Sequence, residues 1–250
     1  MPDAEGHRTH FTMPRNWPIR PILSVVIPTI DREGLLDQAL KSISDSLGSA
    51  YPVEFIVVDS SVPPIRLYIA RGHGEIIHSD ERFTGAGKPI NLGCQASQGR
   101  YVAILNDDMV IEGQPLSEAV EIMERDPQVG QVAIPWWNGN SGEPRISALG
   151  NLDFEYANFG VTRRVLGDQA GWWGEYRHFY GDPHLTCSIL AQGYTMAIAK
   201  RGSVKHAEAP SYFRGLADQW KSAITSMEDH LRFMQQWGHM IDGPKGGKSV

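Results

Sequence analysis

Residues 23–59, LSVVIPTIDREGLLDQALKSISDSLGSAYPVEFIVVD, decide the fold class. Residues 23–28 are a short β-branched run stopped by proline, which predicts a strand buried on both faces. Apolar residues then recur at helical spacing from Glu33 to Leu47, and residues 53–58 form a second apolar run that ends at Asp59. Strand, helix and strand in this order predict a βαβ unit, and therefore a parallel sheet with a right-handed crossover.

The same alternation continues outward along the chain. We expect a weak strand at 75–78, a helix at 88–98, a strand at 101–105, a helix at Pro115–Arg125 and a strand at 129–134. Residues 138–184 show no clear periodicity, and beyond them we expect a helix at 183–192, a strand at 194–199 and a long helix over 216–237. The pattern predicts one α/β domain at 21–242, with a nucleotide-binding half (21–135) and a second half with C-terminal helices (136–242). An N-terminal extension (1–20) and a disordered tail (243–250) are expected to flank it.

Composition favours a globular protein from a reducing compartment. Hydrophobic residues make up 41% of the 250, which is enough for a sizeable core and excludes a wholly disordered chain. The formal net charge of −6 argues against bulk electrostatic binding to nucleic acid or anionic membranes. Cys94 and Cys187 are too few for a disulfide framework and form no zinc-type pair. Because no signal-like or membrane-spanning apolar stretch is present, we expect a cytoplasmic protein without a transmembrane segment.

Polar clusters follow three of the expected strands, at residues 29–32 (TIDR), 59–61 (DSS) and 106–108 (NDD). In an open parallel sheet, ligands bind beyond the carboxyl ends of the strands, so all three clusters are expected to line one crevice. Taken singly, each cluster also suits an ordinary turn, because Asp, Asn and Ser are common turn residues. The adjacent carboxylates of Asp107 and Asp108 need positive compensation after a buried strand. A divalent cation that also binds a diphosphate is the natural candidate.

The order of LSVVIPTIDR, FIVVDSS and GKPINLGCQASQGRYVAILNDDM resembles the nucleotide-sugar half of inverting, family-2-like glycosyltransferases with a GT-A fold. The resemblance covers about residues 22–135 and resumes weakly at 180–206. Each motif is short, but their order and spacing together are specific. The resemblance implies a Rossmann-like, mixed and mainly parallel sheet, a nucleotide-diphosphate sugar as donor, with UDP as the expected nucleotide, and Mn2+ or Mg2+ as cofactor.

Carried onto this chain, the resemblance implies a set of residues on the donor side. They are Pro28, Thr29 and Asp31 beside the base and ribose, Asp59 on the base, Lys88 and Asn91 near the nucleotide or its phosphates, and Asp107 in the metal motif. Asp108 is the expected direct metal ligand. Lys88 fits an exposed loop lysine equally well. Asn106 and Ile90 depart from the family, which often has Asp and Arg at these two positions.

On the acceptor side, residues 179–185 (FYGDPHL) imply Asp182 as the general base that takes the proton of the acceptor hydroxyl. Asp-Pro at a helix start also suits an N-cap, so that alternative stays open. Gly181 and His184 occupy positions where the family often has carboxylates. His206 matches a late histidine that completes the metal site or contacts the diphosphate, and it equally fits a surface histidine after a strand.

The sequence therefore predicts a metal-dependent inverting glycosyltransferase that moves a sugar from a nucleotide-diphosphate sugar to an acceptor hydroxyl. Two alternatives stay open: a catalytically silent nucleotide-sugar or glycan-binding module, and a sugar-1-phosphate nucleotidyltransferase, whose Gly-rich basic signature does not occur at 28–31. The acceptor stays open among a glycan, a protein, a lipid-linked carrier, a small molecule and a modified nucleobase. The oligomeric state also stays open.

The tryptophan pair Trp172 and Trp173 is flanked by glycines. We expect this pair in a mobile lid.

Overall fold

The computed structural model of the chain describes residues 20–47, 51–65, 73–78, 85–138, 141–149, 154–206 and 216–241. The N-terminal extension expected at 1–20, apart from its last residue, and the tail expected at 243–250 lie outside these ranges. Among the described helices, none is long and apolar enough to cross a membrane.

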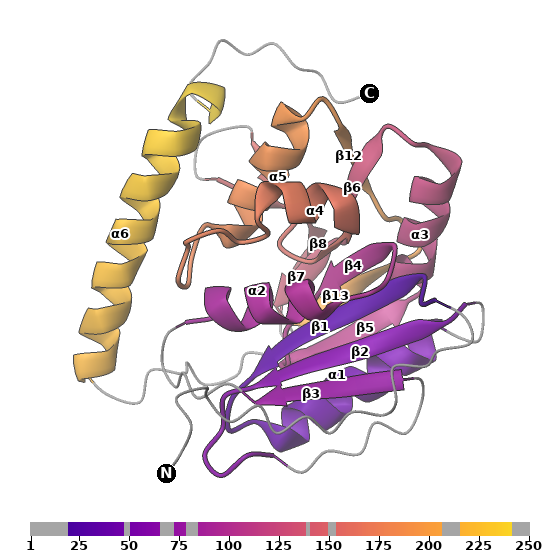
Figure 1. The fold of residues 1–250 in the computed structure, drawn as a ribbon, viewed down its shortest axis with the longest axis horizontal. Helices are drawn as coiled ribbons and strands as arrows, with labels where there is room; N and C mark the ends of the chain where they lie inside the picture. The colour runs from indigo at the N-terminus through magenta and orange to yellow at the C-terminus, as the bar shows by residue number, and fades with distance from the viewer. Residues whose placement is uncertain are drawn as a thin grey trace, which may run out of the picture.

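A seven-stranded sheet forms the centre of the molecule (Figure 1). In spatial order its strands are β12 (Thr195–Ile198), β6 (Val129–Ala133), β11 (Gly160–Arg163), β4 (Tyr101–Ile104), β1 (Leu23–Thr29), β2 (Val53–Asp59) and β3 (His73–His78). Neighbouring strands are parallel except at β11, which runs antiparallel to both β4 and β6. The predicted α/β class with a mixed, mainly parallel sheet is confirmed.

Helices cover both faces of this sheet (Figure 1). The helices α1 (Glu33–Leu47) and α3 (Pro115–Arg125) pack on one face, and α2 (Gly87–Ala96), α4 (Arg164–Ala170) and α5 (Gly181–Ala191) on the other. Val25 and Ile27 of β1 are buried in the apolar cluster of α1, whereas Val26 between them is buried with Ile90 of α2. Since successive strand residues point to opposite faces, a strand covered on both sides needs the continuous apolar run found at 23–28.

A second, four-stranded sheet lies beside the first. Its strands, in spatial order, are β5 (Met109–Gly113), β13 (Gly202–His206), β7 (Trp136–Asn138) and β8 (Ser141–Arg145). A separate antiparallel pair consists of β9 (Ser147–Ala148) and β10 (Glu155–Tyr156). The sequence pattern predicts neither β5 nor β13, because both are short and mix polar with apolar residues. The aperiodic residues 138–184 contain short strands together with α4.

The expected lid at Trp172 and Trp173 is wrong. Both side chains are buried, with exposed fractions of 2% and 7%, in the apolar cluster that also contains Ile90 of α2 and Leu185 of α5. Large aromatic side chains bury much apolar surface, so this pair stabilises the packing of α2, α4 and α5.

The last helix, α6 (Leu216–Ile241), stands at one side of the molecule, along α5 (Figure 1). Its inner face carries the fully buried Phe233, which packs with Tyr176 and Cys187. Ile224, Met227 and Leu231 on the same helix are exposed. In the described part of α6, a single face therefore holds the helix to the body of the protein.

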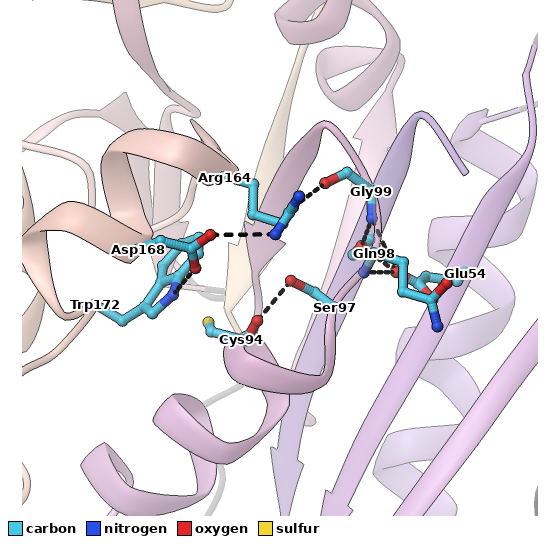
Figure 2. A network of polar contacts seen from close by, with 9 residues as sticks. Glu54, Cys94, Ser97, Gln98, Gly99, Arg164, Asp168 and Trp172 are labelled. Atoms are coloured by element: carbon cyan, nitrogen blue, oxygen red, sulfur yellow. Dashed lines mark hydrogen bonds and ion pairs between the residues drawn. The ribbon is translucent and has the colours of Figure 1, made fainter. Parts of the chain in front are cut away.

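At the amino ends of the strands, a buried carboxylate ties several segments together (Figure 2). Glu54, near the start of β2, accepts hydrogen bonds from the hydroxyl of Ser24 and from the backbone N–H groups of Gln98 and Gly99. The Gly99 carbonyl accepts a 3.0 Å hydrogen bond from Arg164 of α4. Because β1, β2 and β4 are parallel, this network lies at the edge opposite the polar strand ends, and it belongs to the framework of the fold.

Candidate functional site

The carboxyl ends of β1, β2 and β4 meet at one edge of the central sheet. Pro28 and Thr29 end β1, and Thr29 pairs in register with Asp59, the last residue of β2. The Thr29 hydroxyl donates a 2.7 Å hydrogen bond to Asp107 Oδ2, in the turn after β4. The parallel arrangement thus brings the three polar clusters to one edge, as the sequence predicts.

Arg32 is the cation that contacts the acidic pair, although the sequence pattern assigns it no role. Its Nη1 atom lies 3.3 Å from Asp107 Oδ1 and 2.8 Å from Asp108 Oδ2. All three side chains are at least four-fifths buried, so their charges interact more strongly than they would in water. The sequence does hold one signal for this role of Arg32. The residue belongs to the polar cluster at 29–32, which is expected at the same sheet edge as the acidic cluster at 106–108.

His206 reaches the acidic pair from the second sheet. The strand β13 pairs antiparallel with β5 in a register that places His206 opposite Met109, the residue that follows Asp108. The Nε2 atom of His206 lies 3.0 Å from Asp108 Oδ1 and 3.3 Å from Asn106 Nδ2. The two residues expected at the metal, Asp108 and His206, are therefore adjacent.

The two carboxyl groups of the pair differ in acidity because their partners differ. Burial raises the pKa of Asp108, but hydrogen bonding to His206 and the positive charge of Arg32 outweigh this effect, and the pKa is lowered overall. Burial also raises the pKa of Asp107, and the Thr29 hydroxyl and Arg32 offset that rise only in part. Asp108 is the carboxyl group that ionises more readily, which suits a metal ligand.

The donor atoms at Asp108 fit a divalent cation. Two ligands at adjacent corners of an octahedron, with bonds of about 2.1 Å, lie about 3 Å apart. The separation of Asp108 Oδ1 and His206 Nε2 is 3.0 Å. Within the ranges that the structure describes, no three His, Cys, Asp or Glu side chains are arranged to hold a metal. The two donors would leave most coordination positions to other ligands, as at Mg2+ sites completed by water and substrate phosphates.

Asp59 is the residue expected at the nucleotide base. Its carboxylate stabilises the loop that follows β2. Its oxygens accept 2.9 Å hydrogen bonds from the backbone N–H groups of Ser61 and Ile65, and Oδ2 lies 3.0 Å from His78 Nδ1. The backbone N–H of Asp31, a residue with a left-handed φ of 53°, donates a 2.7 Å hydrogen bond to Ser61 Oγ. The loops after β1 and β2 are therefore joined, and contact of Asp31 or Asp59 with a base stays a prediction.

Asn91 and Lys88 both lie on α2. The Asn91 side chain accepts a 3.0 Å hydrogen bond from the Trp173 N–H and donates a 2.8 Å bond to the Gly174 carbonyl. It therefore fixes the turn after α4. Lys88 is exposed in the first turn of α2. The expected place of both residues near the phosphates stays a prediction.

Asp182 lies in the first turn of α5. The N-cap position is Tyr180, so the alternative that Asp182 is the N-cap is wrong. Burial raises the pKa of the Asp182 carboxyl well above its usual range, against a smaller opposing effect of a hydrogen bond from its own backbone N–H. A carboxylate with a raised pKa is the stronger base, and a general base works best when its pKa approaches the working pH.

Side chains of β7, β9 and β10 lie around His206 and within the electrostatic reach of Asp182. Asp182 acts electrostatically on Tyr156 of β10, which pairs with Ser147 of β9. Ser147 accepts a 2.7 Å hydrogen bond from Trp136 Nε1, and the Trp136 and His206 rings lie 6.0 Å apart. Tyr156, Ser147 and Trp136 thus form a path from the electrostatic surroundings of Asp182 to the His206 ring.

His184, at a position where the family often has a carboxylate, lies in the interior of the protein. Its Nδ1 atom accepts a 2.9 Å hydrogen bond from Trp237 Nε1 of α6, and its ring lies 5.0 Å from that of Tyr176. Burial lowers the pKa of His184, so the neutral ring is favoured. This position therefore joins α5 to α6 in the core.

Comparison with known proteins places these elements in a family. The sequence profile of glycosyl transferase family 2 matches residues 24–207, from β1 through β13. An uncharacterized glycosyltransferase from Haemophilus influenzae is 22% identical over 114 residues, which are 46% of this chain and 38% of that protein.

Two solved structures share the fold. TarS from S. aureus, in complex with UDP, has a TM-score of 0.56 at 14% identity over 84% of this chain and 65% of that chain. A mannosyltransferase from Pyrobaculum calidifontis, in complex with GDP-Man and Mn2+, has a TM-score of 0.55 at 18% identity over 93% of this chain and 67% of that one. The chain thus spans less than two thirds of the curated relative and of TarS. The GT-A fold implied by the strand-end motifs is confirmed, and the chain belongs to glycosyl transferase family 2.

Proposed function

We propose that the chain transfers a sugar from a nucleotide-diphosphate sugar to an acceptor hydroxyl, with inversion at the anomeric carbon. The observation that carries the proposal is the meeting of Asp107, Asp108 and His206 at the carboxyl edge of the sheet. Ligands of open α/β sheets bind at this edge. Membership of glycosyl transferase family 2 supports the reaction class.

We propose a UDP-sugar as the donor. TarS has been solved with UDP and with UDP-GlcNAc, which supports uracil, whereas the similar mannosyltransferase was solved with GDP-Man. In the proposed complex, Pro28, Thr29 and Asp31 border the base and ribose, and Asp59 bonds the base. Lys88 and Asn91 lie on the phosphate side.

In the proposed site, Asp108 and His206 hold Mn2+ or Mg2+. When bound, such an ion supplies positive charge beside the leaving diphosphate. Arg32 keeps the two carboxylates in place through its contacts of 2.8 and 3.3 Å and offsets their charge. Thr29 orients Asp107 through its hydroxyl.

Asp182 takes the proton in the proposed reaction. The acceptor oxygen attacks the anomeric carbon as its hydroxyl proton passes to the Asp182 carboxylate. The bond from that carbon to the diphosphate oxygen breaks on the opposite face, so the configuration inverts. The raised pKa of Asp182 makes its carboxylate basic enough to hold this proton until solvent removes it.

Thermal unfolding with UDP or GDP, each with and without Mn2+, tests the donor and the metal. We expect the melting temperature to rise most with UDP and Mn2+ together, because a ligand at about 100 times its Kd stabilises the native state by about 2.7 kcal/mol. Asp108→Ala should remove the part of this shift that depends on Mn2+, while Asp37→Ala, at an exposed position on α1, should keep it. An equal shift in EDTA would refute the metal site, and no shift with either nucleotide would refute the proposed function.

A catalytically silent binding module would show the same thermal shift, so a second measurement is needed. Slow release of UDP from UDP-GlcNAc, or of GDP from GDP-mannose, with water as the acceptor identifies an enzyme. We propose that the natural acceptor carries a hydroxyl, on a glycan, a protein, a lipid-linked carrier, a small molecule or a modified nucleobase. Screening these classes with the accepted donor identifies it.

A further inference from the structure

A fully buried carboxylate on α6 lies outside the residues that match the family. Asp229 has a side chain that is 1% exposed, and the family match ends at residue 207. Its Oδ1 accepts a 3.2 Å hydrogen bond from the backbone N–H of Arg177, and its Oδ2 accepts 3.0 Å bonds from those of His178 and Phe179. Three successive N–H groups directed at one carboxylate form a strong anion site. The guanidinium of Arg232, one turn along α6, lies 3.8 Å from Oδ1.

The loop held by Asp229 leads directly into the helix that carries Asp182. Tyr180 follows the loop with a left-handed φ of 66°, an unfavourable conformation for a residue other than glycine. Such a conformation persists where the surroundings hold it. Two more residues of α6 hold Tyr180 in this conformation. His230 Nδ1 lies 2.9 Å from the Tyr180 hydroxyl, and the Phe233 ring lies 5.1 Å from that of Tyr180.

The same loop is held from its other side by the start of α2. The Arg177 carbonyl accepts a 2.9 Å hydrogen bond from the N–H of Gly87. A Cβ atom at Gly87 would lie 1.8 Å from the Tyr176 carbonyl oxygen, so the two backbones are in close contact. Removing the Asp229 carboxylate therefore leaves this second anchor of the loop in place.

We propose that Asp229 is a positioning residue of the transferase site: through its carboxylate, α6 sets the loop that presents Asp182 to the acceptor. This inference rests on the function proposed above. Asp229 itself touches neither donor nor acceptor. It acts through the backbone of residues 177–179 and the turn at Tyr180.

The test compares Asp229→Asn with Glu228→Gln. Asparagine has the shape of aspartate, but it directs an amide NH2 at backbone donors and carries no charge. Glu228→Gln removes the same charge one residue away, at an exposed side chain whose Oε2 lies 3.7 Å from Arg177 Nη1. We expect Asp229→Asn to slow UDP release from UDP-GlcNAc with Mn2+ by about tenfold or more, because small misplacements of a reacting group have large effects on rate. The Kd for UDP with Mn2+ should stay within about twofold in both variants, and Glu228→Gln should keep the wild-type rate.

Asp229→Glu provides the second comparison, because it keeps the carboxylate and moves it by one methylene group. We expect Asp229→Glu to recover part of the hydrolysis rate lost in Asp229→Asn. If the asparagine variant does not fold, Asp229→Glu is compared with Glu228→Gln in its place. Hydrogen exchange at the amides of residues 177–179 should be faster in Asp229→Asn than in Glu228→Gln. The same measurements are made with GDP-mannose and GDP if the wild-type chain selects GDP.

Three results would overturn the inference. Unchanged donor hydrolysis in Asp229→Asn, with nucleotide binding intact in the wild type, refutes the positioning role alone. Equal losses of hydrolysis and nucleotide affinity in Asp229→Asn and Asp229→Glu show a purely structural role. A wild-type chain that binds neither UDP nor GDP refutes the proposed function, and the positioning role with it.

Discussion

At the scale of single residues, the site depends on how buried charges are compensated. Asp108 lies between Arg32, 2.8 Å from one carboxylate oxygen, and His206, 3.0 Å from the other. Asp107 shares Arg32 and gains the Thr29 hydroxyl. Two adjacent carboxylates with little exposure would destabilise the fold without these partners. Asp182 differs, because burial raises its pKa and, among the residues that the structure describes, no cation lowers it.

We predict that Arg32→Gln destabilises the protein in a pH-dependent way. At pH 8 the free energy of unfolding should fall by about 2 kcal/mol, because two largely buried carboxylates lose their cation. Without Arg32 the pKa values of both carboxyl groups rise, so protonation at pH 5 relieves the repulsion and the loss shrinks. Urea denaturation at the two pH values measures the difference. Arg100→Gln, in an exposed pair with Glu124, should change stability by less than about 1 kcal/mol, and equal losses for Arg32→Gln at pH 5 and pH 8 would contradict the argument.

We predict opposite effects of Asp182→Asn on activity and on stability. Donor hydrolysis should fall by about 100-fold, as expected for loss of a general base, while UDP binding with Mn2+ persists. The folded-state pKa of Asp182 is raised, so the wild type loses stability as pH rises through that pKa, and asparagine removes this loss. The melting temperature of the variant should therefore exceed that of the wild type at pH 8, with the difference vanishing near pH 4. A variant that keeps its hydrolysis rate would show that Asp182 is not the base.

At the scale of elements, strand pairing decides which residues meet. The loop residue Asp108 is followed by β5, and β5 pairs with β13 in the register that puts His206 opposite Met109. Since side chains alternate along a strand, a slip of one residue would turn His206 to the other face of the sheet. At the amino ends of β1, β2 and β4, Glu54 holds three segments together without contributing to the site.

We predict that Glu54→Gln lowers stability and leaves the ligand site unchanged. The carboxylate accepts three hydrogen bonds at one oxygen, and a neutral amide accepts them more weakly, so the free energy of unfolding should fall by about 1–2 kcal/mol. The shift in melting temperature with UDP and Mn2+ should equal that of the wild type. Glu33→Gln, at an exposed position in the first turn of α1, serves as control. Weaker nucleotide binding in Glu54→Gln at unchanged stability would contradict this separation of framework and site.

At the scale of the whole molecule, the described chain shares one central sheet between its two halves. The strands β1, β2, β3, β4 and β6 come from residues before 135, whereas β11 and β12 come from later residues and join the same sheet. The division at residue 135 therefore separates proposed roles within this sheet. The helix α6 lies beyond the matched family residues and contacts the Asp182 helix through Phe233 and Trp237.

The sequence by itself determined the α/β class, the ends of α1 and α3 and the polar edge of the sheet. These features follow from local periodicity and from the fixed direction of parallel strands, which single segments carry. Only the tertiary structure decided that Arg32 bridges the acidic pair, that Trp172 and Trp173 are buried, and that Asp229 holds the loop before Asp182. The contacts of Arg32 and of Asp229 join residues 50 or more positions apart in the chain, and the buried tryptophans pack on Ile90 of the distant helix α2. Non-local contacts arise from register and packing between elements, and no periodicity within either segment encodes them.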